Sequence, residues 1–335
     1  MTNDGSPGID SGFNKAFDAR WKDFPDYIIG ITKEIWEDRQ IHTLHHYYSD
    51  DIVVRSPSSV VIGNQSVIAA TMATLAEFPD RQLLGEDVIW SGDNDSGYLS
   101  SHRIFSTATH AHAGVYGEPT GRQLRYRIIA DCAARNNQIY DEWLIRDQTA
   151  IIKQLGLDAK RYARDLITRE GGPQQCVKPL SPATDQQGGY QGRGNNNPWG
   201  QRYADTLCRA MAAEMSIIPA EYDRACALEY PGGQSEHGWS AADQFWMGLR
   251  SSLPNAKFEV HHCIGREDNL LPPRAALRWS LHGKHDGWGL FGAPTGAEVY
   301  VLGISHAEYG PYGLKREWVL FDETAVWKQI VLQTG

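Results

Sequence analysis

The sequence predicts an α+β protein in which one domain occurs twice in tandem. Residues 109–122 form a segment rich in Gly and Pro, and residues 284–297 repeat it. Six residues recur between the two segments at a constant separation of 175, as for the two threonines (295 − 120 = 175). Further residue pairs keep this separation from about residue 47 to residue 154. A spacing held over that length indicates a duplicated domain rather than a short-period repeat.

The repeated segment has the character of a connection between two strands. Both copies read Gly-x-x-Gly-x-Pro-Thr-Gly, and Gly and Pro at this density exclude a helix. The residues on either side alternate as strand residues do. Each copy also places a histidine, His110 or His285, at the end of the incoming strand. From that position the side chain could point into the mouth of a cavity.

Composition and charge narrow the function classes. The chain has 335 residues, which is room for about two domains. Its net charge of −9 argues against nucleic acid or an anionic membrane as the main partner. It shows no apolar run long enough to span a membrane and no signal peptide. Its five cysteines form no Cys-x-x-Cys pair. Because a reducing compartment fits this pattern better than a disulfide framework does, we expect a cytoplasmic protein.

The first copy is expected to begin with helices and to end with a long sheet. Residues 1–19 are expected to be a disordered tail. Pro25 and Asp26 give a helix start before apolar residues at helical spacing, and further helical segments are expected at residues 42–48 and after Gly63. Strands are expected at residues 52–55, 82–90, 97–111, 123–134 and 138–146, and a last helix at residues 148–157.

The domain boundaries follow from the repeat and from a shift in composition. The first domain is expected at residues 20–157, and the second, with the same order of elements, at residues 198–335. Between them, residues 158–197 are expected to be a linker. Its second half is dominated by Gly, Gln and Asn and has almost nothing to bury.

Several motifs occur in an order known from one family. They are Phe78-Pro79-Asp80, Pro119-Thr120-Gly121-Arg122, Glu142-Trp143 and Arg278-Trp279, together with the two histidines of the repeated segment. Taken with the order of helices and strands, they resemble the SnoaL-like polyketide cyclases of the nuclear transport factor 2 (NTF2)-like superfamily. The resemblance implies two cone-shaped domains, each a curved antiparallel sheet with three N-terminal helices. It also implies an intrachain pseudo-dimer formed through the convex sheet faces.

The resemblance implies a cofactor-independent acid/base enzyme acting on a small carbonyl or polyketide-like compound. Aldol cyclisation (including ester cyclase activity), isomerisation and elimination by a lyase are the reactions it suggests. The alternative is a non-catalytic small-ligand-binding or scaffold protein, because the same fold hosts both kinds of function. The expected partner is a small-molecule substrate, with no nucleic acid, membrane or cofactor. The chain could also form a homodimer.

The acid/base aspartate of the family has no direct match in this sequence. The aligned positions are Ala130 and Ser305, and Asp131 and His306 follow one residue later. One residue along a strand changes the face on which a side chain lies. Either a bulge turns Asp131 into the cavity, or these domains do not use this acid/base.

Four residues are candidates for catalysis: His110, Asp131, Arg55 and His285. A histidine titrates near neutral pH and can move a proton, but it could equally tie the Gly-rich connection together by hydrogen bonds. Arg55 could bind a substrate carboxylate or enolate, whereas Tyr230, at its matched position, offers only one hydrogen bond. We therefore expect the two cavities to differ and the first domain to carry most of any activity.

Polar and aromatic residues on the elements expected to line the cavities are candidates for substrate binding. They are Trp36, His46, Tyr48, His102, His112, Tyr116, Trp143, Tyr230, Trp288, His306 and Trp318. Core packing is the alternative for the aromatic residues. Asp131 is expected beside Glu142 across the predicted hairpin, and His306 beside Glu317. A salt-linked network on the outer face of the sheet is the alternative role for these two pairs. No metal is expected, because His110-x-His112 is not kept in the second copy, where Gly287 replaces His112.

Overall fold

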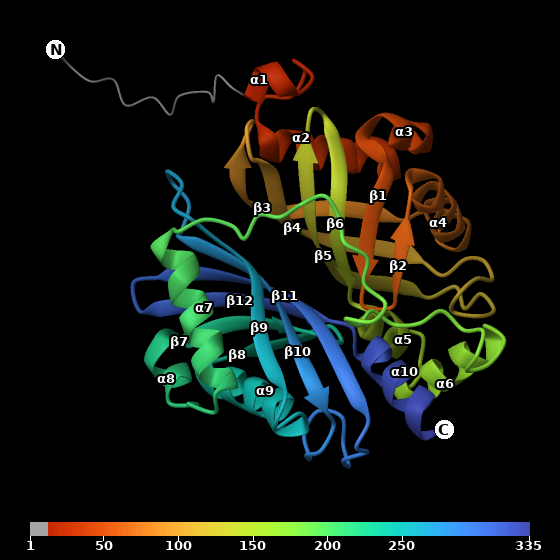
Figure 1. Cartoon of the computed structure of the whole chain (residues 1–335), viewed down its shortest axis with the longest axis vertical. Helices are drawn as coiled ribbons and strands as arrows, with labels where there is room; N and C mark the ends of the chain where they lie inside the picture. The colour runs from red at the N-terminus through yellow and green to blue at the C-terminus, as the bar shows by residue number, and fades with distance from the viewer. Residues whose placement is uncertain (1–12) are drawn as a thin grey trace.

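The computed structural model describes residues 13–335, which form two six-stranded sheets with helices covering one face of each (Figure 1). The first sheet, in the order β2-β1-β6-β5-β4-β3, contains β1 (Tyr48–Ser56), β2 (Ser59–Ile62), β3 (Gln82–Asp93), β4 (Gly97–Thr109), β5 (Gln123–Arg135) and β6 (Gln138–Arg146). The second, in the order β8-β7-β12-β11-β10-β9, contains β7 (Tyr222–Tyr230), β8 (Gln234–His237), β9 (Lys257–Arg266), β10 (Arg274–Lys284), β11 (Glu298–Gly310) and β12 (Gly313–Phe321).

The first half of the chain has more helical elements than the second. The first half has α1 (Phe13–Ala16), α2 (Phe24–Thr32), the π-helix η1 (Lys33–Glu37), the 3-10 helix η2 (Ile41–Thr43), α3 (Leu44–Tyr47), α4 (Asn64–Glu77), α5 (Gln148–Gln154) and α6 (Ala159–Arg169). The second half has α7 (Pro198–Met211), α8 (Ile217–Glu221), α9 (Trp239–Ser252) and α10 (Glu323–Thr334). Within the described residues, none of these helices has the length and apolar character needed to cross a membrane.

Local sequence explains why matching elements begin at matching residues. Gly63 and Gly238 precede α4 and α9 with φ of 83° and 84°, a region that glycine enters without the steric cost of a Cβ atom. Asp147 and Asp322 begin α5 and α10 by accepting hydrogen bonds from backbone N–H groups of the first turn. The repeated Gly-Pro segment joins β4 to β5 and β10 to β11, as predicted.

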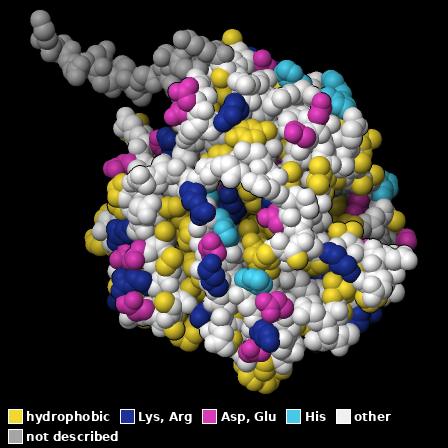
Figure 2. All heavy atoms as spheres, in the orientation of Figure 1, with side chains coloured by type: hydrophobic (Ala, Val, Ile, Leu, Met, Phe, Trp, Pro, Cys, Tyr) yellow, Lys and Arg dark blue, Asp and Glu magenta, His cyan; other side chains and the backbone are white. Residues whose placement is uncertain are grey.

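The two sheets pack against each other through the faces that the helices leave uncovered (Figure 1). Ile129 and Ile145 of the first sheet meet Leu302, Ile304 and Leu320 of the second in one buried cluster. This packing confirms the tandem α+β fold and the intrachain pseudo-dimer. On the face shown in Figure 2, acidic and basic side chains are interspersed.

Each sheet contains one parallel pair, which differs from the expectation of a purely antiparallel sheet. β1 runs parallel to β6, and β7 runs parallel to β12. The other neighbouring strands pair antiparallel. In each sheet, the parallel pair consists of the first strand in chain order and the last, which lie side by side.

The predicted tail and linker contain ordered structure. Residues 1–12 of the expected tail lie outside the described residues, but Phe13 and Phe17 are buried and pack on Phe24 and Tyr98. The disorder expected up to residue 19 is therefore wrong from Phe13 onward, because these aromatic rings complete the first core. The segment expected as a linker includes α6, which packs against α10.

The register of β1 corrects two of the residue equivalences. Tyr48 pairs with Ile139, and its counterpart Tyr222 pairs with Leu314, so the separation here is 174 (222 − 48). The turn between β7 and β8 contains one more residue than the turn between β1 and β2, which restores the separation of 175. Tyr222 therefore matches Tyr48, whereas a constant separation of 175 would pair it with Tyr47. In the same way Arg55 matches Glu229, not Tyr230, since these residues pair with Trp143 and Trp318 respectively.

Candidate functional site

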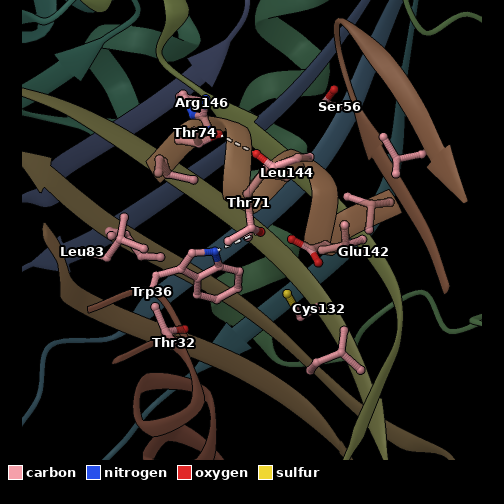
Figure 3. Close-up of a pocket in the computed structure, with 18 of the residues that line it drawn as sticks. Thr32, Trp36, Ser56, Thr71, Thr74, Leu83, Cys132, Glu142, Leu144 and Arg146 are labelled. Atoms are coloured by element: carbon pink, nitrogen blue, oxygen red, sulfur yellow. Dashed lines mark hydrogen bonds between the residues drawn. The ribbon is translucent and has the colours of Figure 1, made fainter. Parts of the chain in front are cut away.

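The first domain holds a cavity of about 280 Å³ between its helices and the inner face of its sheet (Figure 3). Apolar side chains make up much of the wall, among them Ile28, Ile31, Val67, Ile104, Ile128 and Leu144. Four polar residues stand out on this wall because they could act on a ligand: Tyr48, Thr71, His102 and Glu142. Arg81 and Arg146 also line the cavity. A concave, mainly apolar space with a few polar groups is typical of a small-molecule site.

Strand alternation decides which side chains reach this cavity. Glu142 and Arg146 on β6 face inward, while Trp143 between them faces the second domain. On β5, Ala130 faces inward and Asp131 faces outward. The pairing of β5 with both neighbours is regular through Asp131, so no bulge turns its carboxylate into the cavity. The first domain therefore does not place Asp131 where the resemblance led us to expect an acid/base aspartate.

Glu142 is the carboxylate that does enter the cavity. Its side chain is buried, and Tyr48 donates a hydrogen bond to it. Burial raises the pKa of Glu142 to about 7, and Asp141 adds to this rise while the Tyr48 hydrogen bond opposes it. A carboxyl group with this pKa can both accept and return a proton near neutral pH. From the sequence, Glu142 was expected only as a neighbour of Asp131. The alternation of side chains along β6 directs Glu142 into the cavity, and this pattern could have identified it.

His102 adds a neutral imidazole to the same wall. Burial lowers its pKa to about 4, so the ring is uncharged at neutral pH. Its Nδ1 lies 3.2 Å from the Ser100 hydroxyl. Trp36, another predicted residue, lines the cavity and its indole Nε1 donates to the Thr71 hydroxyl at 3.4 Å (Figure 3). The structure thus brings together Trp36, Tyr48 and His102 from the predicted set.

The two histidines of the repeated segment lie elsewhere. His110 and His285 are fully buried, and the Nδ1 atom of each lies 3.1 Å from the hydroxyl of Thr120 or Thr295 in its own loop. His110 Nε2 is 3.2 Å from a Glu77 carboxylate oxygen, in an orientation that does not meet hydrogen-bond geometry. Neither histidine lines the cavity. The structure places them where they tie the Gly-rich connection together, which is the alternative role considered for them.

A second group of predicted residues lies between the two domains. Arg278 donates to Asp131 at 2.7 Å, and His306 lies 2.8 Å from the Ser101 hydroxyl. Arg55, which was predicted to bind a ligand, instead forms a buried ion pair with Asp141 at 2.5 Å. The guanidinium groups of Arg278 and Arg103 stack on Trp143 and Trp318 respectively. These residues form a network on the outer face of the sheet.

The remaining predicted residues are dispersed. His46, His112 and Trp288 are exposed, and 70% of the Trp288 side chain is accessible to solvent. Tyr116 is buried behind the cavity wall, where its hydroxyl donates to Gln148. Tyr230 lies in the core of the second domain. Among residues 13–335, no group of three or more His, Cys, Asp and Glu side chains is arranged to hold a metal ion.

The second domain fills the corresponding space with aromatic side chains. Three cavity-lining positions carry larger residues there: Ala70, Thr71 and Ile104 correspond to Phe245, Trp246 and Trp279. The counterpart of Glu142 is Glu317, which accepts hydrogen bonds from the hydroxyls of Tyr203 (2.8 Å), Tyr222 (2.6 Å) and Tyr230 (2.8 Å). The inward carboxylate is thus kept in both domains, but in the first it lines the cavity and in the second it contacts three tyrosine hydroxyls.

Comparison with known proteins finds a family match and several similar solved structures. Residues 26–155 match the family described as SnoaL-like polyketide cyclase. This SnoaL-like segment lies within the first domain. Similar solved structures include IdmH from Streptomyces antibioticus (23% identity, 40% of this chain, 98% of that chain, TM-score 0.35) and AclR from Streptomyces galilaeus (16%, 40%, 95%, 0.34). A SnoaL-like polyketide cyclase from Agrobacterium tumefaciens is a third (16%, 40%, 98%, 0.32). No curated protein matches the chain.

Proposed function

We propose that the SnoaL-like first domain is a cofactor-independent acid/base enzyme that acts on a small carbonyl or polyketide-like compound. The observation that carries the proposal is Glu142, a carboxyl group with a pKa of about 7 that faces a mainly apolar cavity. Enzymes raise a carboxyl pKa in this way when it must exchange protons near pH 7.

In this proposal Glu142 removes a proton from the carbon next to the substrate carbonyl. The two electrons of the broken C–H bond move into the carbonyl to give an enolate. The Thr71 hydroxyl and the neutral His102 ring line the same cavity and are candidate donors to the enolate oxygen. The Tyr48 hydroxyl holds the Glu142 carboxylate in place. Return of the proton to another carbon gives isomerisation, attack of the enolate on a second carbonyl gives aldol cyclisation, and loss of a β-substituent gives elimination.

The second domain is proposed to be a scaffold. Its inward carboxylate, Glu317, is fully buried and accepts hydrogen bonds from three tyrosine hydroxyls and from Trp246. Activity in the first domain alone also agrees with the unequal sites expected from the sequence, although the residues that make them unequal are different ones.

Exchange of α-protons for deuterium tests the proposal even while the complete reaction is unidentified. The protein is incubated in D₂O with aromatic ketones, keto acids and keto sugars, and exchange is followed by proton NMR. We expect at least one compound to exchange faster than with buffer alone and the Glu142→Gln variant to lose this acceleration. Saturable binding of compounds with no exchange in any of them would instead support a non-catalytic binding protein.

A further inference from the structure

Two arginines on the cavity wall have no acidic partner. Arg81 is only 8% exposed, and the Nε atoms of both Arg81 and Arg146 are buried without a hydrogen-bond partner. No Asp or Glu among residues 13–335 forms an ion pair with either guanidinium group. Burial is the main cause that lowers the pKa of Arg81; Tyr126 opposes this effect, and the nearby charge of Arg146 lowers the pKa further.

The groups around these arginines are mainly hydroxyls. Tyr126 contacts Arg81, and Tyr116 contacts Arg146. Asp322 of the second domain also lines the cavity and contributes to raising the pKa of Arg146, while one of its carboxylate oxygens caps α10 by accepting from the backbone N–H groups of Thr324 and Ala325. This end of the cavity therefore carries two cations and one carboxylate, which forms no ion pair with either of them.

Other buried arginines of the chain are paired. Between the domains, Arg55 pairs with Asp141, Arg278 pairs with Asp131, and Arg274 pairs with Asp87. Pairing is the rule because an uncompensated buried charge is costly. The departure from this rule at Arg81 and Arg146 coincides with the cavity, which indicates that a ligand supplies the missing negative charge.

The second domain gives an internal comparison. The positions of Arg81 and Arg146 are taken by Ala256 and Phe321 there, both buried in the filled core. The domain whose core is filled at these positions thus lacks both cations, although its fold is the same. A structural need of the fold would have kept them, so the arginines belong to the cavity rather than to the architecture.

We propose that Arg81 and Arg146 form a subsite for a carboxylate, and that the ligand is an apolar molecule with a carboxylate at one end. A guanidinium group presents parallel N–H donors that match a carboxylate. The inference rests on the proposed function in placing the reacting carbon of this ligand at Glu142. Four residues along β6 separate the Cα atoms of Glu142 and Arg146 by roughly 13 Å. A keto acid with a short chain or one or two rings suits this arrangement.

Binding of matched probes to the full chain tests the subsite. 2-Naphthoate and its neutral analogue 2-naphthamide are titrated by calorimetry at pH 7.5. We expect the carboxylate to bind about tenfold more tightly than the amide, because hydrogen bonds to charged groups are the stronger kind. Arg146→Met should remove this preference and leave amide binding unchanged, and Arg146→Lys should retain part of it. Arg122→Met, which removes an exposed arginine outside the cavity, should keep the full preference.

Two results would overturn the inference. One is equal affinity of the wild-type protein for the two probes, and the other is a parallel loss of both probes in Arg146→Met with an unchanged thermal unfolding midpoint. If Arg146→Met does not fold, the lysine variants provide the test instead. A full preference for the carboxylate probe in both Arg146→Lys and Arg81→Lys would contradict a forked guanidinium contact. The Glu142→Gln variant separates this inference from the proposed function. This variant should keep the preference for the carboxylate probe whether or not Glu142 is the proton acceptor.

Discussion

Glu142 and Glu317 occupy the same position in the two sheets, but Glu142 faces a cavity and Glu317 faces three tyrosine hydroxyls. Each keeps one equivalent tyrosine, Tyr48 or Tyr222, as a hydrogen-bond donor. The duplication has therefore preserved an inward tyrosine–glutamate pair while its surroundings differ. This difference leads to separate predictions for the two carboxylates.

Glu142 should destabilise the folded protein at high pH. Its pKa of about 7 lies above the ordinary value of 4.5, so the folded state binds more protons than the unfolded state between these pH values. Stability therefore falls as pH rises through this range. We expect Glu142→Gln to equal the wild type at pH 4.5 or below and to be more stable by up to about 3 kcal/mol above pH 7. Urea unfolding across this pH range measures the difference, and a pH-independent difference would contradict it.

Glu317 should be needed for the stability of the second domain. Replacing it with leucine leaves three buried tyrosine hydroxyls without their acceptor, and each unsatisfied group is costly. We expect Glu317→Leu to lower the free energy of unfolding by about 2–5 kcal/mol. Chemical denaturation gives this value. A loss of less than about 1 kcal/mol would mean that the hydroxyls find other partners.

Filling the first cavity should abolish ligand binding while the fold persists. Trp246 occupies the position of Thr71 in the second domain, so the equivalent helix, α9, accommodates a tryptophan at this position. We expect Thr71→Trp to weaken binding of 2-naphthamide at least tenfold, because the indole occupies the space of the ligand. Met72→Trp is the control, since Met72 lies on the same helix and is 55% exposed. Unchanged binding in Thr71→Trp would place the ligand elsewhere.

The histidines of the repeated connection should act on stability and not on catalysis. Each is buried, and its Nδ1 meets a threonine hydroxyl of its own loop. We expect His110→Ala and His285→Ala to lose about 1–3 kcal/mol each. Deuterium exchange by the folded fraction should stay at the wild-type rate. A specific loss of exchange in a fully folded His110→Ala protein would return this residue to the candidate site.

The fold could be predicted from the sequence, but most residues of the candidate site could not, for a physical reason. The constant separation of the Gly-Pro segments indicates a duplicated domain without any knowledge of side-chain contacts. This is possible because Gly and Pro determine the backbone conformation locally. Which face a strand residue occupies depends on register, and a shift of one residue reverses it. Asp131 and Glu142 illustrate this, since they were expected side by side but Glu142 pairs with Cys132 instead.

The arginines were missed for a related reason. Nothing in the local sequence around Arg81 or Arg146 shows whether an acidic partner lies near in space. Arg55 appeared to be an available cation until the fold brought it to Asp141 and Asp185. Only the tertiary structure distinguishes paired from unpaired cations. The matched positions Ala256 and Phe321 were visible in the repeat and could have drawn attention to both arginines.

The rate of α-proton exchange in Glu142→Gln and Glu317→Gln tests the central claim most directly. The two variants make the same change at equivalent positions, and each rate is measured on folded protein at pH 7.5 with the best compound found by NMR. If Glu142 in the first cavity is the proton acceptor, Glu142→Gln should lose about 10²-fold or more, as removal of a general base does. Glu317→Gln should keep the wild-type rate. A Glu142→Gln protein that exchanges protons as fast as the wild type, or an equal loss in both variants, would contradict the account.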